Sequence, residues 1–494
     1  MGVRNFLGAR TDETLLDLPS TGNVIDRDVW VSQSILMHRG RFLVKNTGYG
    51  SKYMRMLRQN VVGAEGFLLQ VKSYDFEQVP DRLNPGSTIW TKKPDEFANS
   101  YIEEAWREWS NSSSVSINTN DTFRLFTMLA LTNTAMDGEV FIRLRRGYKG
   151  NKYRFGLEMI TSEYLDLMDN RNLQNGNFIR MGIEHDPAGK PVAYWFTVKD
   201  PALDLYMVAP NKKIRVPAEE IIHLYHPEFA NQTRGLSWFA SALINFHHLA
   251  KYTEASLKNA RVSQKLGWYE RSAEAGDYVG EEDDLGRFIE DYVPGEIFIA
   301  PAGYKFNGFD PKFPSDQYGA FTKAITRELA SAMGVSYNTL ANDLEGVNYS
   351  SIRAGLLDER EFYKEVQNWL KEKFLNPVFS AWLEMFLVSP DTRLPFNKFE
   401  KFNKPTWRGR SWPWVDPLKD SQAQEMALRN GFKTRRQILA ESGLDYEETM
   451  LQLAAEKEYE EKLGLKFGDL NAPNQNSPAT TSEGDDGQNN STQS

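Results

Sequence analysis

Cysteine is absent from the 494 residues of this chain. The absence excludes disulfides, thiolate catalysis and Cys-based zinc or iron–sulfur sites, and it is typical of a protein made in a reducing compartment. The sequence also has no window near the ~20 consecutive apolar residues that a bilayer-spanning helix needs. Its N-terminus has no apolar signal-peptide core. We therefore expect neither a membrane protein nor a secreted one.

The chain also has no excess of positive charge: it contains 58 Lys and Arg and 67 Asp and Glu, which give a formal net charge of −9. Proteins that coat nucleic acid neutralise phosphates with clustered Lys and Arg, so any DNA contact here should be local or repulsive. The 40% hydrophobic and 25% charged residues are typical of a globular protein. At about 100–200 residues per domain, the length predicts roughly three packed units.

Helices and then strands are predicted in the N-terminal half. Apolar spacing and capping residues predict helices at about 94–111 and 122–137, the second ending at Gly138. The segments 140–144, 154–160 and 193–197 are rich in strand-forming residues and separated by turn residues. Residues 138–230 are therefore expected to be mostly sheet.

In the middle of the chain, the apolar spacing predicts two long helices that flank an insert. Leu243, Ala250 and Leu257 repeat at seven residues within a proline-free helix at 236–264. A second helix follows and ends at Gly334. The insert, residues 266–309, contains an acidic run and a hairpin at 296–303. A third helix starts near residue 350, with a break or kink expected at Asn376-Pro377.

The C-terminal region predicts three short helices and then a tail. Thr434 and Gln437 have capping-box spacing. Glycines at 431, 443 and 464 have the spacing of helix ends. Residues 468–494 are almost devoid of apolar side chains, so we expect them to be disordered.

The search for catalytic chemistry yields weak candidates. His223 and His226 could serve a metal-dependent hydrolase, but a β-type run places residues three apart on opposite faces, and no third ligand follows at a standard spacing. Structural histidines are the favoured interpretation. The glycine-rich segment at 48–52 is not a P-loop, and neither G-x-S segment has its closing glycine. We therefore predict no catalytic residue, no metal and no cofactor.

Two further patterns leave alternatives open. Residues 434–452 have the outline of a helix-turn-helix, which would suit a DNA-binding regulator or packaging accessory. The acidic start of its second helix would meet phosphates with the wrong sign, so ordinary helical packing is favoured. The 12 tryptophans, among them Trp407, Trp412 and Trp414, indicate either a large core or subunit interfaces.

A series of short motifs resembles the lambda-type portal protein family of tailed bacteriophages, in the family's order, over about residues 25–465. The QTRGLSW segment at 232–238 is similar to the family's Q-x-R-G-x-P/S-W lead into a long helix, with Ser237 where many relatives carry proline. The most telling motif is NYSSIR at 348–353. The others are DGEVF (137–141), VPAEEIIH (216–223), PGE (294–296), MGVSY (333–337), WPWVDP (412–417) and GFKT (431–434).

The resemblance implies an α+β portal fold. Residues 1–236 would form a β-rich wing, 237–264 and 315–334 two stem helices, and 265–310 a small α/β clip between them. Residues 335–415 would hold a tunnel loop, a long helix and the return to the wing. Residues 416–466 would be a helical crown and 467–494 a disordered tail.

The resemblance also implies a function without catalysis. The chain would form a ring, usually of twelve subunits, at one capsid vertex of the virion, assembled in the host cytoplasm, through which double-stranded DNA is packaged and ejected. Expected partners are the terminase large subunit, head–tail adaptor or neck proteins, and the major capsid and scaffold proteins. Expected site residues are the tunnel loop (Asn342, Asp343, Leu344, Glu345, Gly346, Val347, Asn348, Tyr349), the channel-helix candidates Lys323 and Arg327, and the clip docking residues Glu281, Glu282, Asp283, Asp284 and Glu296.

Overall fold

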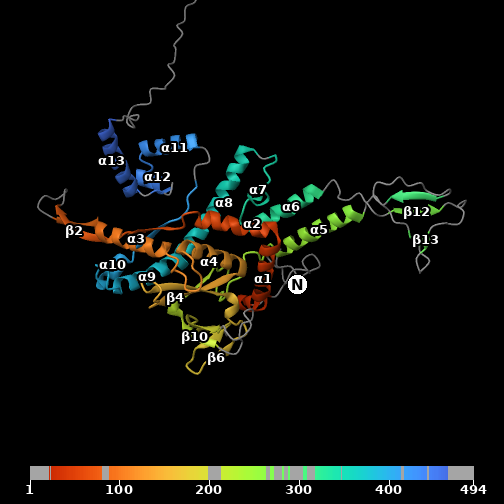
Figure 1. Ribbon diagram of the computed structural model, residues 1–494, viewed down its shortest axis with the longest axis horizontal. Coiled ribbons are helices and arrows are strands. Elements are labelled where there is room, and N and C mark those ends of the chain that lie inside the picture. The colour runs from red at the N-terminus through yellow and green to blue at the C-terminus, as the bar shows by residue number, and fades with distance from the viewer. Residues whose placement is uncertain are drawn as a thin grey trace, which may run out of the picture. The chain divides into compact units, whose positions relative to one another are not determined.

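The computed structural model describes residues 24–80, 88–198, 213–262, 267–271, 281–282, 288–289, 304–308, 318–346, 348–412, 417–441 and 446–464, together with Gly22 and Leu444. It divides into two compact units, Met1–Arg410 and Ser411–Ser494. Helices and strands both contribute, as Figure 1 shows, so the expected α+β class is confirmed.

Helix α1 (Ile25–Asn46) opens the described part of the first unit and lies beside α2 (Gly48–Leu57). The Thr47 side chain between them accepts a hydrogen bond from the Gly50 backbone N–H and thereby caps α2. One turn of π-helix, η3 (Arg58–Val62), extends α2. The inner face of α1 is buried, and its outer face remains exposed.

The two predicted N-terminal helices are confirmed as α3 (Glu96–Asn111) and α4 (Phe123–Asp137). Asp95 and Thr122 cap them by accepting hydrogen bonds from backbone N–H groups. Gly138 ends α4 with a φ of 97°, a conformation that favours glycine.

Residues 138–230 form two antiparallel sheets in the described ranges, as expected. The first has the order β11-β4-β5, and α4 packs against β4. The second has the order β10-β9-β8-β7-β6. Phe141 of the first sheet and Tyr194 and Phe196 of the second pack together in one buried cluster. The strands are β4 (Glu139–Arg146), β5 (Phe155–Thr161), β6 (Arg171–Asn172), β7 (Phe178–Arg180), β8 (Ile183–His185), β9 (Pro191–Thr197), β10 (Lys213–Pro217) and β11 (Ile221–Tyr225).

The predicted long helices are α5 (Leu243–Val262) and α6 (Tyr318–Ala332), which contact each other. Tyr252 stacks on Tyr318 with ring centroids 5.5 Å apart. Helix α5 begins seven residues later than the expected residue 236. The Trp238 N–H donates instead to the Ala135 carbonyl, and Ala240 and Ala242 make tighter three-residue turns.

Short strands are present in the insert between α5 and α6. Strand β12 (Gly267–Arg271) pairs with β15 (Tyr304–Gly308), and β13 (Glu281–Glu282) pairs with β14 (Phe288–Ile289). The hairpin predicted at 296–303 lies outside the described residues.

After α7 (Tyr337–Ala341), the third long helix is α8 (Tyr349–Leu370). It continues into α9 (Asn376–Val388), and at Asn376-Pro377, where a break or kink was expected, the chain stays helical after a change from α- to π-helix. A π-helical turn, η6 (Lys371–Leu375), precedes α9, so that Pro377 stands at the start of a new α-helical segment, where its missing N–H is tolerated.

Aromatic side chains fill the core where α3, α4 and α9 meet. Trp106 packs edge-on against Trp382 and Trp407, with ring centroids 5.1 and 5.4 Å away. Trp407 belongs to β16 (Pro405–Arg408), which pairs with β1 (Leu68–Val71) and ties the end of the unit to its beginning. Core packing is therefore the role of these three tryptophans. A separate two-stranded hairpin is formed by β2 (Tyr74–Pro80) and β3 (Thr88–Pro94).

The second unit contains α11 (Pro417–Arg429), α12 (Arg435–Glu441) and α13 (Tyr446–Leu463), which confirms the three predicted helices. The capping box is present, since the Gln437 N–H donates to Thr434 Oγ1 and the Thr434 N–H donates to Gln437 Oε1. The predicted tail lies outside the described residues. Across the part of the chain that the structure describes, no helix is long and apolar enough to span a bilayer.

Candidate functional site

The conformation of the loop between α7 and α8 is set by Asn342 and Asn348 at its two ends and by Gly346 between them. Asn342 ends α7 in a left-handed conformation, with a φ of 55°, and Gly346 has a φ of 66°. The Asn348 side chain caps α8 by accepting a hydrogen bond from the Ser351 N–H at 2.8 Å. Tyr349 is already the first residue of α8 rather than part of the loop, and Val347 lies outside the described residues.

Asp343 anchors the loop to α6 and α7. Its Oδ2 lies 3.0 Å from Lys323 Nζ and accepts a hydrogen bond of 2.6 Å from the Tyr337 hydroxyl, while its Oδ1 accepts one from the Glu345 N–H. These three donors, the tyrosine first, lower the pKa of Asp343 to about 2. Partial burial, together with the same carboxylate, raises the pKa of Tyr337 to about 12. The loop therefore carries a carboxylate that stays ionised at neutral pH.

The two channel-helix candidates converge on the same place. The charged ends of Lys323 and Arg327 each lie 5.5 Å from the centre of the Tyr337 ring. Lys52 of α2 also donates a hydrogen bond to the Asn342 side chain. The structure thus brings the loop and both basic residues together. The sequence predicted that Lys323 could contact phosphates, but in the structure it is paired with Asp343.

The clip candidates are described only in part. Glu281 and Glu282 form β13, opposite Ile289 and Phe288. Asp283, Asp284 and Glu296 lie outside the described residues.

His223, in β11, and His226, directly after this strand, do not point to a common site. His223 is buried and pairs with Glu139, while the ring of His226 lies near Trp238 and Trp369. Within the described ranges, no three His, Asp or Glu side chains are placed to hold a metal ion. In the helix-turn-helix candidate, the exposed Arg436 of α12 lies 6.0 Å from the ring of Tyr446 at the start of α13.

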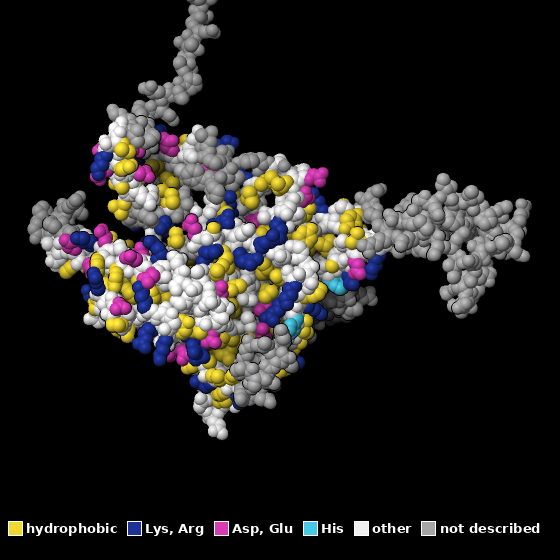
Figure 2. All heavy atoms as spheres, viewed as in Figure 1, with side chains coloured by type: hydrophobic (Ala, Val, Ile, Leu, Met, Phe, Trp, Pro, Cys, Tyr) yellow, Lys and Arg dark blue, Asp and Glu magenta, His cyan; other side chains and the backbone are white. Residues whose placement is uncertain are grey.

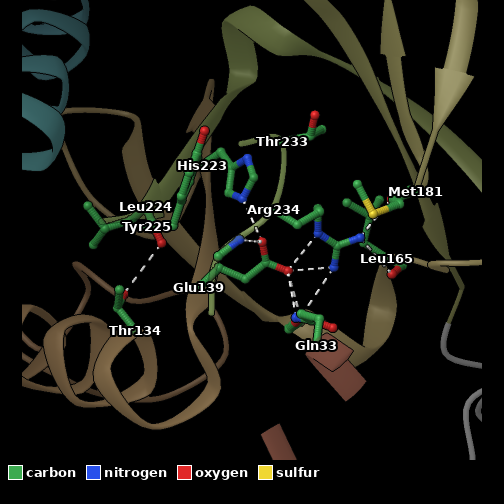
Figure 3. Close-up of polar contacts among 12 residues, drawn as sticks. Gln33, Thr134, Glu139, Leu165, Met181, His223, Leu224, Tyr225, Thr233 and Arg234 are labelled. Atoms are coloured by element: carbon green, nitrogen blue, oxygen red, sulfur yellow. Dashed lines mark hydrogen bonds and ion pairs between the residues drawn. The ribbon is translucent and has the colours of Figure 1, made fainter. Parts of the chain in front are cut away.

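The centre of the first unit holds a buried charge network that sequence reasoning missed (Figure 3). Its acid is Glu139, fully buried at the start of β4. Glu139 Oε1 accepts hydrogen bonds from Arg234 Nε at 2.7 Å, from the Ser162 hydroxyl at 2.7 Å and from Gln33 Nε2 at 3.1 Å. Its Oε2 lies 2.9 Å from His223 Nε2 and accepts from the Gly235 N–H at the same distance.

Arg234 completes the network from the other side. It is also fully buried, and its Nη1 donates to the carbonyls of Met181 at 2.7 Å and Leu165 at 3.3 Å. Burial opposes ionisation of Glu139, but the Arg234 charge and the His223 hydrogen bond outweigh it and hold the pKa of Glu139 far below its ordinary value. Burial lowers the pKa of His223, in spite of its carboxylate partner. The network is therefore an ionised pair supported by neutral donors.

Two glycines make this pairing possible. A Cβ on Gly235 would lie 2.1 Å from the Gly138 carbonyl oxygen, and one on Gly138 would lie 2.5 Å from the carbonyl carbon of Leu236. Only glycine allows the two backbone segments to approach so closely. Each glycine is next to one member of the ion pair, so the close approach brings Glu139 and Arg234 together.

Helix α1 is attached to the same two segments. Arg41 donates two hydrogen bonds of 2.7 Å to the carboxylate of Asp137, and Gln33 donates to Glu139. At the N-terminal end, Asp26 Oδ1 accepts from the Thr233 N–H at 2.8 Å. The segments 137–139 and 233–235 therefore position α1 as well as each other.

Comparison with known proteins decides the family. The model of the family described as "Phage portal protein, lambda family" matches residues 17–367. The chain belongs to this family of phage portal proteins. The resemblance drawn from the sequence motifs is confirmed, and as a portal protein the chain is a structural component that connects head and tail in the virion.

Several relatives and solved structures are similar to this portal protein. The "Probable portal protein" of Halomonas phage phiHAP-1 is 33% identical over 472 residues, which cover 94% of this chain and 88% of that protein. "Portal protein B" of Escherichia phage lambda is 22% identical and covers 86% of this chain and 83% of its own. The neck of a native GTA particle matches with a TM-score of 0.40 at 12% identity, over 84% of this chain and 93% of that one.

The network explains why two of the portal motifs contain the residues they do. In the sequence, DGEVF and QTRGLSW are separate strings, and the last residue of the first, Phe141, is 91 positions before Gln232, the first residue of the second. A Glu in one motif and an Arg in the other, each beside a glycine, are the sequence signal that could have paired them. Their role in this portal protein is to hold β4, β11 and α1 in one arrangement.

Proposed function

We propose that the chain assembles into a ring of about twelve copies at one vertex of the capsid and serves as a conduit, without a catalytic step of its own, for double-stranded DNA. Family membership carries the proposal. The negative charge of the subunit supports the proposal, because the formal net charge of twelve copies is 12 × −9 = −108. A channel that binds phosphates weakly allows DNA to slide through it.

On this proposal, residues 1–236 are the wing, α5 and α6 the stem helices, residues 265–310 the clip between them, and residues 416–466 the crown. The contact between α5 and α6 supports the stem assignment. Light scattering tests the assembly. A species near 12 × 56.6 kDa, about 680 kDa, with a central hole in negative stain is expected, and a particle lacking a hole would contradict the conduit.

The loop at 342–348 is proposed to line the narrowest part of the channel. Its support is Asn342 and Gly346, residue types that adopt left-handed backbone at little cost, and the exposed acidic side chain of Glu345, which repels phosphates. Tyr349 is left out of this proposal because it belongs to α8.

Two loop variants test this assignment. Deletion of residues 343–348, or the stiffening substitution Gly346→Ala, should leave ring assembly intact and impair DNA packaging or retention. The matched control is Gly189→Ala, which also has a positive φ and open space around it but lies in the turn before β9. Normal packaging by the deletion variant would refute the loop assignment.

The acidic run at 281–284, together with Glu296, is proposed to dock the terminase large subunit during packaging and an adaptor afterwards. Glu281→Lys with Glu282→Lys should weaken binding to both, because reversed charges repel a basic partner surface. The control is the same reversal at Glu460 and Glu461 of α13. Unchanged binding to both partners would show that the run is only a solvated surface.

A further inference from the structure

The outer face of α1 combines exposed apolar and basic side chains. Val31, Ile35 and Phe42 are spaced along one face and are 60%, 50% and 62% exposed. Arg39 and Lys45 flank them and are exposed as well. Among the residues that the structure describes, neither has an ion-pair partner. In the view of Figure 2, Lys and Arg side chains gather over α1 and α2.

This face is held in a fixed position. The opposite side of α1 is tied to the segments 137–139 and 233–235 by hydrogen bonds at Asp26, Gln33 and Arg41. An exposed apolar stripe on such an anchored helix is typical of a surface that binds a partner, because burial of three large apolar side chains would be favourable.

A complementary hollow lies on α8. It has a volume of about 910 Å³ and is lined by Phe362 and Trp369, with Val335 before α7 on its other side. Its rim carries four exposed carboxylates, three of them on α8 and the last in η6: Asp358, Glu361, Glu365 and Glu372. Lys364 also lies on the rim and pairs with Glu361 at 2.6 Å, which leaves the other three carboxylates to give the rim its negative charge. The hollow thus has a small apolar floor, formed in part by the buried Val335 and Trp369, beneath a rim with a net negative charge.

The hollow and the α1 face belong to different sides of the unit. The side of α8 away from the hollow carries the buried Tyr363 and Gln367, and Gln367 Nε2 donates to the Val61 carbonyl of η3. Since η3 extends α2, and α2 lies beside α1, the two surfaces are separated by these helices within one chain. Contact between them must therefore come from two copies.

We propose that the outer face of α1 in one copy docks into the α8 hollow of the next copy. Val31, Ile35 and Phe42 cover the apolar lining, and Arg39 and Lys45 meet the acidic rim. The contact joins two different patches of the same chain, so it is head-to-tail, and repeated contacts of this kind close into a ring. The proposal rests on the ring of the proposed function and names the surfaces that build it.

Charge exchange between the surfaces tests the proposal. The first variant carries Arg39→Glu with Lys45→Glu, and the second carries Asp358→Lys with Glu365→Lys. Each alone should raise the protein concentration needed for ring assembly by at least about tenfold, because like charges then face each other. An equimolar mixture should assemble at a concentration close to that of the wild type, since the two variants can alternate around the ring. A chain with all four substitutions should assemble alone.

Each outcome has one meaning. Light scattering and negative stain give the ring fraction, and circular dichroism of each variant checks that it is folded. If either variant assembles as the wild type does, or if neither the mixture nor the fourfold variant regains assembly, the docking proposal is overturned. If the wild-type chain itself forms no ring, the result counts against the proposed function rather than against these surfaces.

Discussion

Removing the Arg234 charge should destabilise the first unit far more than removing a surface arginine. Arg234→Met leaves the carboxylate of Glu139 buried without its cation and leaves the carbonyls of Met181 and Leu165 without their donor. Breaking one partner of a buried ion pair costs about 3–5 kcal/mol. The control is Arg143→Met, because Arg143 pairs with Glu220 in a part-exposed ion pair, and such pairs contribute less than about 1 kcal/mol.

Urea unfolding followed by tryptophan fluorescence measures the difference. Trp106, Trp109 and Trp382 all lie in the core of the first unit and report on it. With a urea slope of about 3 kcal/mol/M, the loss lowers the midpoint by about 1.0–1.7 M. The control variant should move it by no more than about 0.3 M.

A second substitution distinguishes loss of the ion pair from general damage. Glu139→Gln in the Arg234→Met background removes the unpaired charge, so it should regain part of the lost stability. Equal midpoints for Arg234→Met and Arg143→Met would refute the reasoning, and so would a further loss in the double variant.

Three more outcomes follow from the same contacts. The hydrogen bond from Arg215 outweighs partial burial and lowers the pKa of Glu184 to about 2. The contribution of this pair to the free energy of unfolding is therefore complete above the unfolded-state pKa of about 4.3 and is lost as the pH falls toward 2. Arg215→Met should flatten this part of a curve of stability against pH, and an unchanged curve would exclude the pair as its source. Gly235→Ala places a methyl group 2.1 Å from a backbone carbonyl oxygen and should cost about 2–3 kcal/mol by urea unfolding, so wild-type stability would show that the two segments can separate freely. Trp106→Ala should cost about 3–5 kcal/mol in the same assay, whereas Trp90→Ala, at a side chain 65% exposed, should cost less than about 1; similar losses would contradict the core assignment.

Local patterns predicted most of the helices, because caps and apolar spacing act within a few residues. Thr122 and Gly138 mark the ends of α4, and the Thr434 capping box marks the start of α12. The start of α5 was predicted seven residues too early, since the Trp238 N–H is used by the Ala135 carbonyl, which lies about a hundred residues away in the chain. A break or kink was predicted at Asn376-Pro377, and a π-helical turn interrupts the α-helix directly before this point without ending it.

The order of its motifs was enough to place this sequence in its family. That placement is possible because motifs are read from neighbouring residues. The pairing of Glu139 with Arg234, the attachment of α1 to both, and the engagement of Lys323 by Asp343 were decided only by the tertiary structure. Each joins groups that are separated in sequence, and which acid meets which donor depends on the packing that brings two backbone segments together.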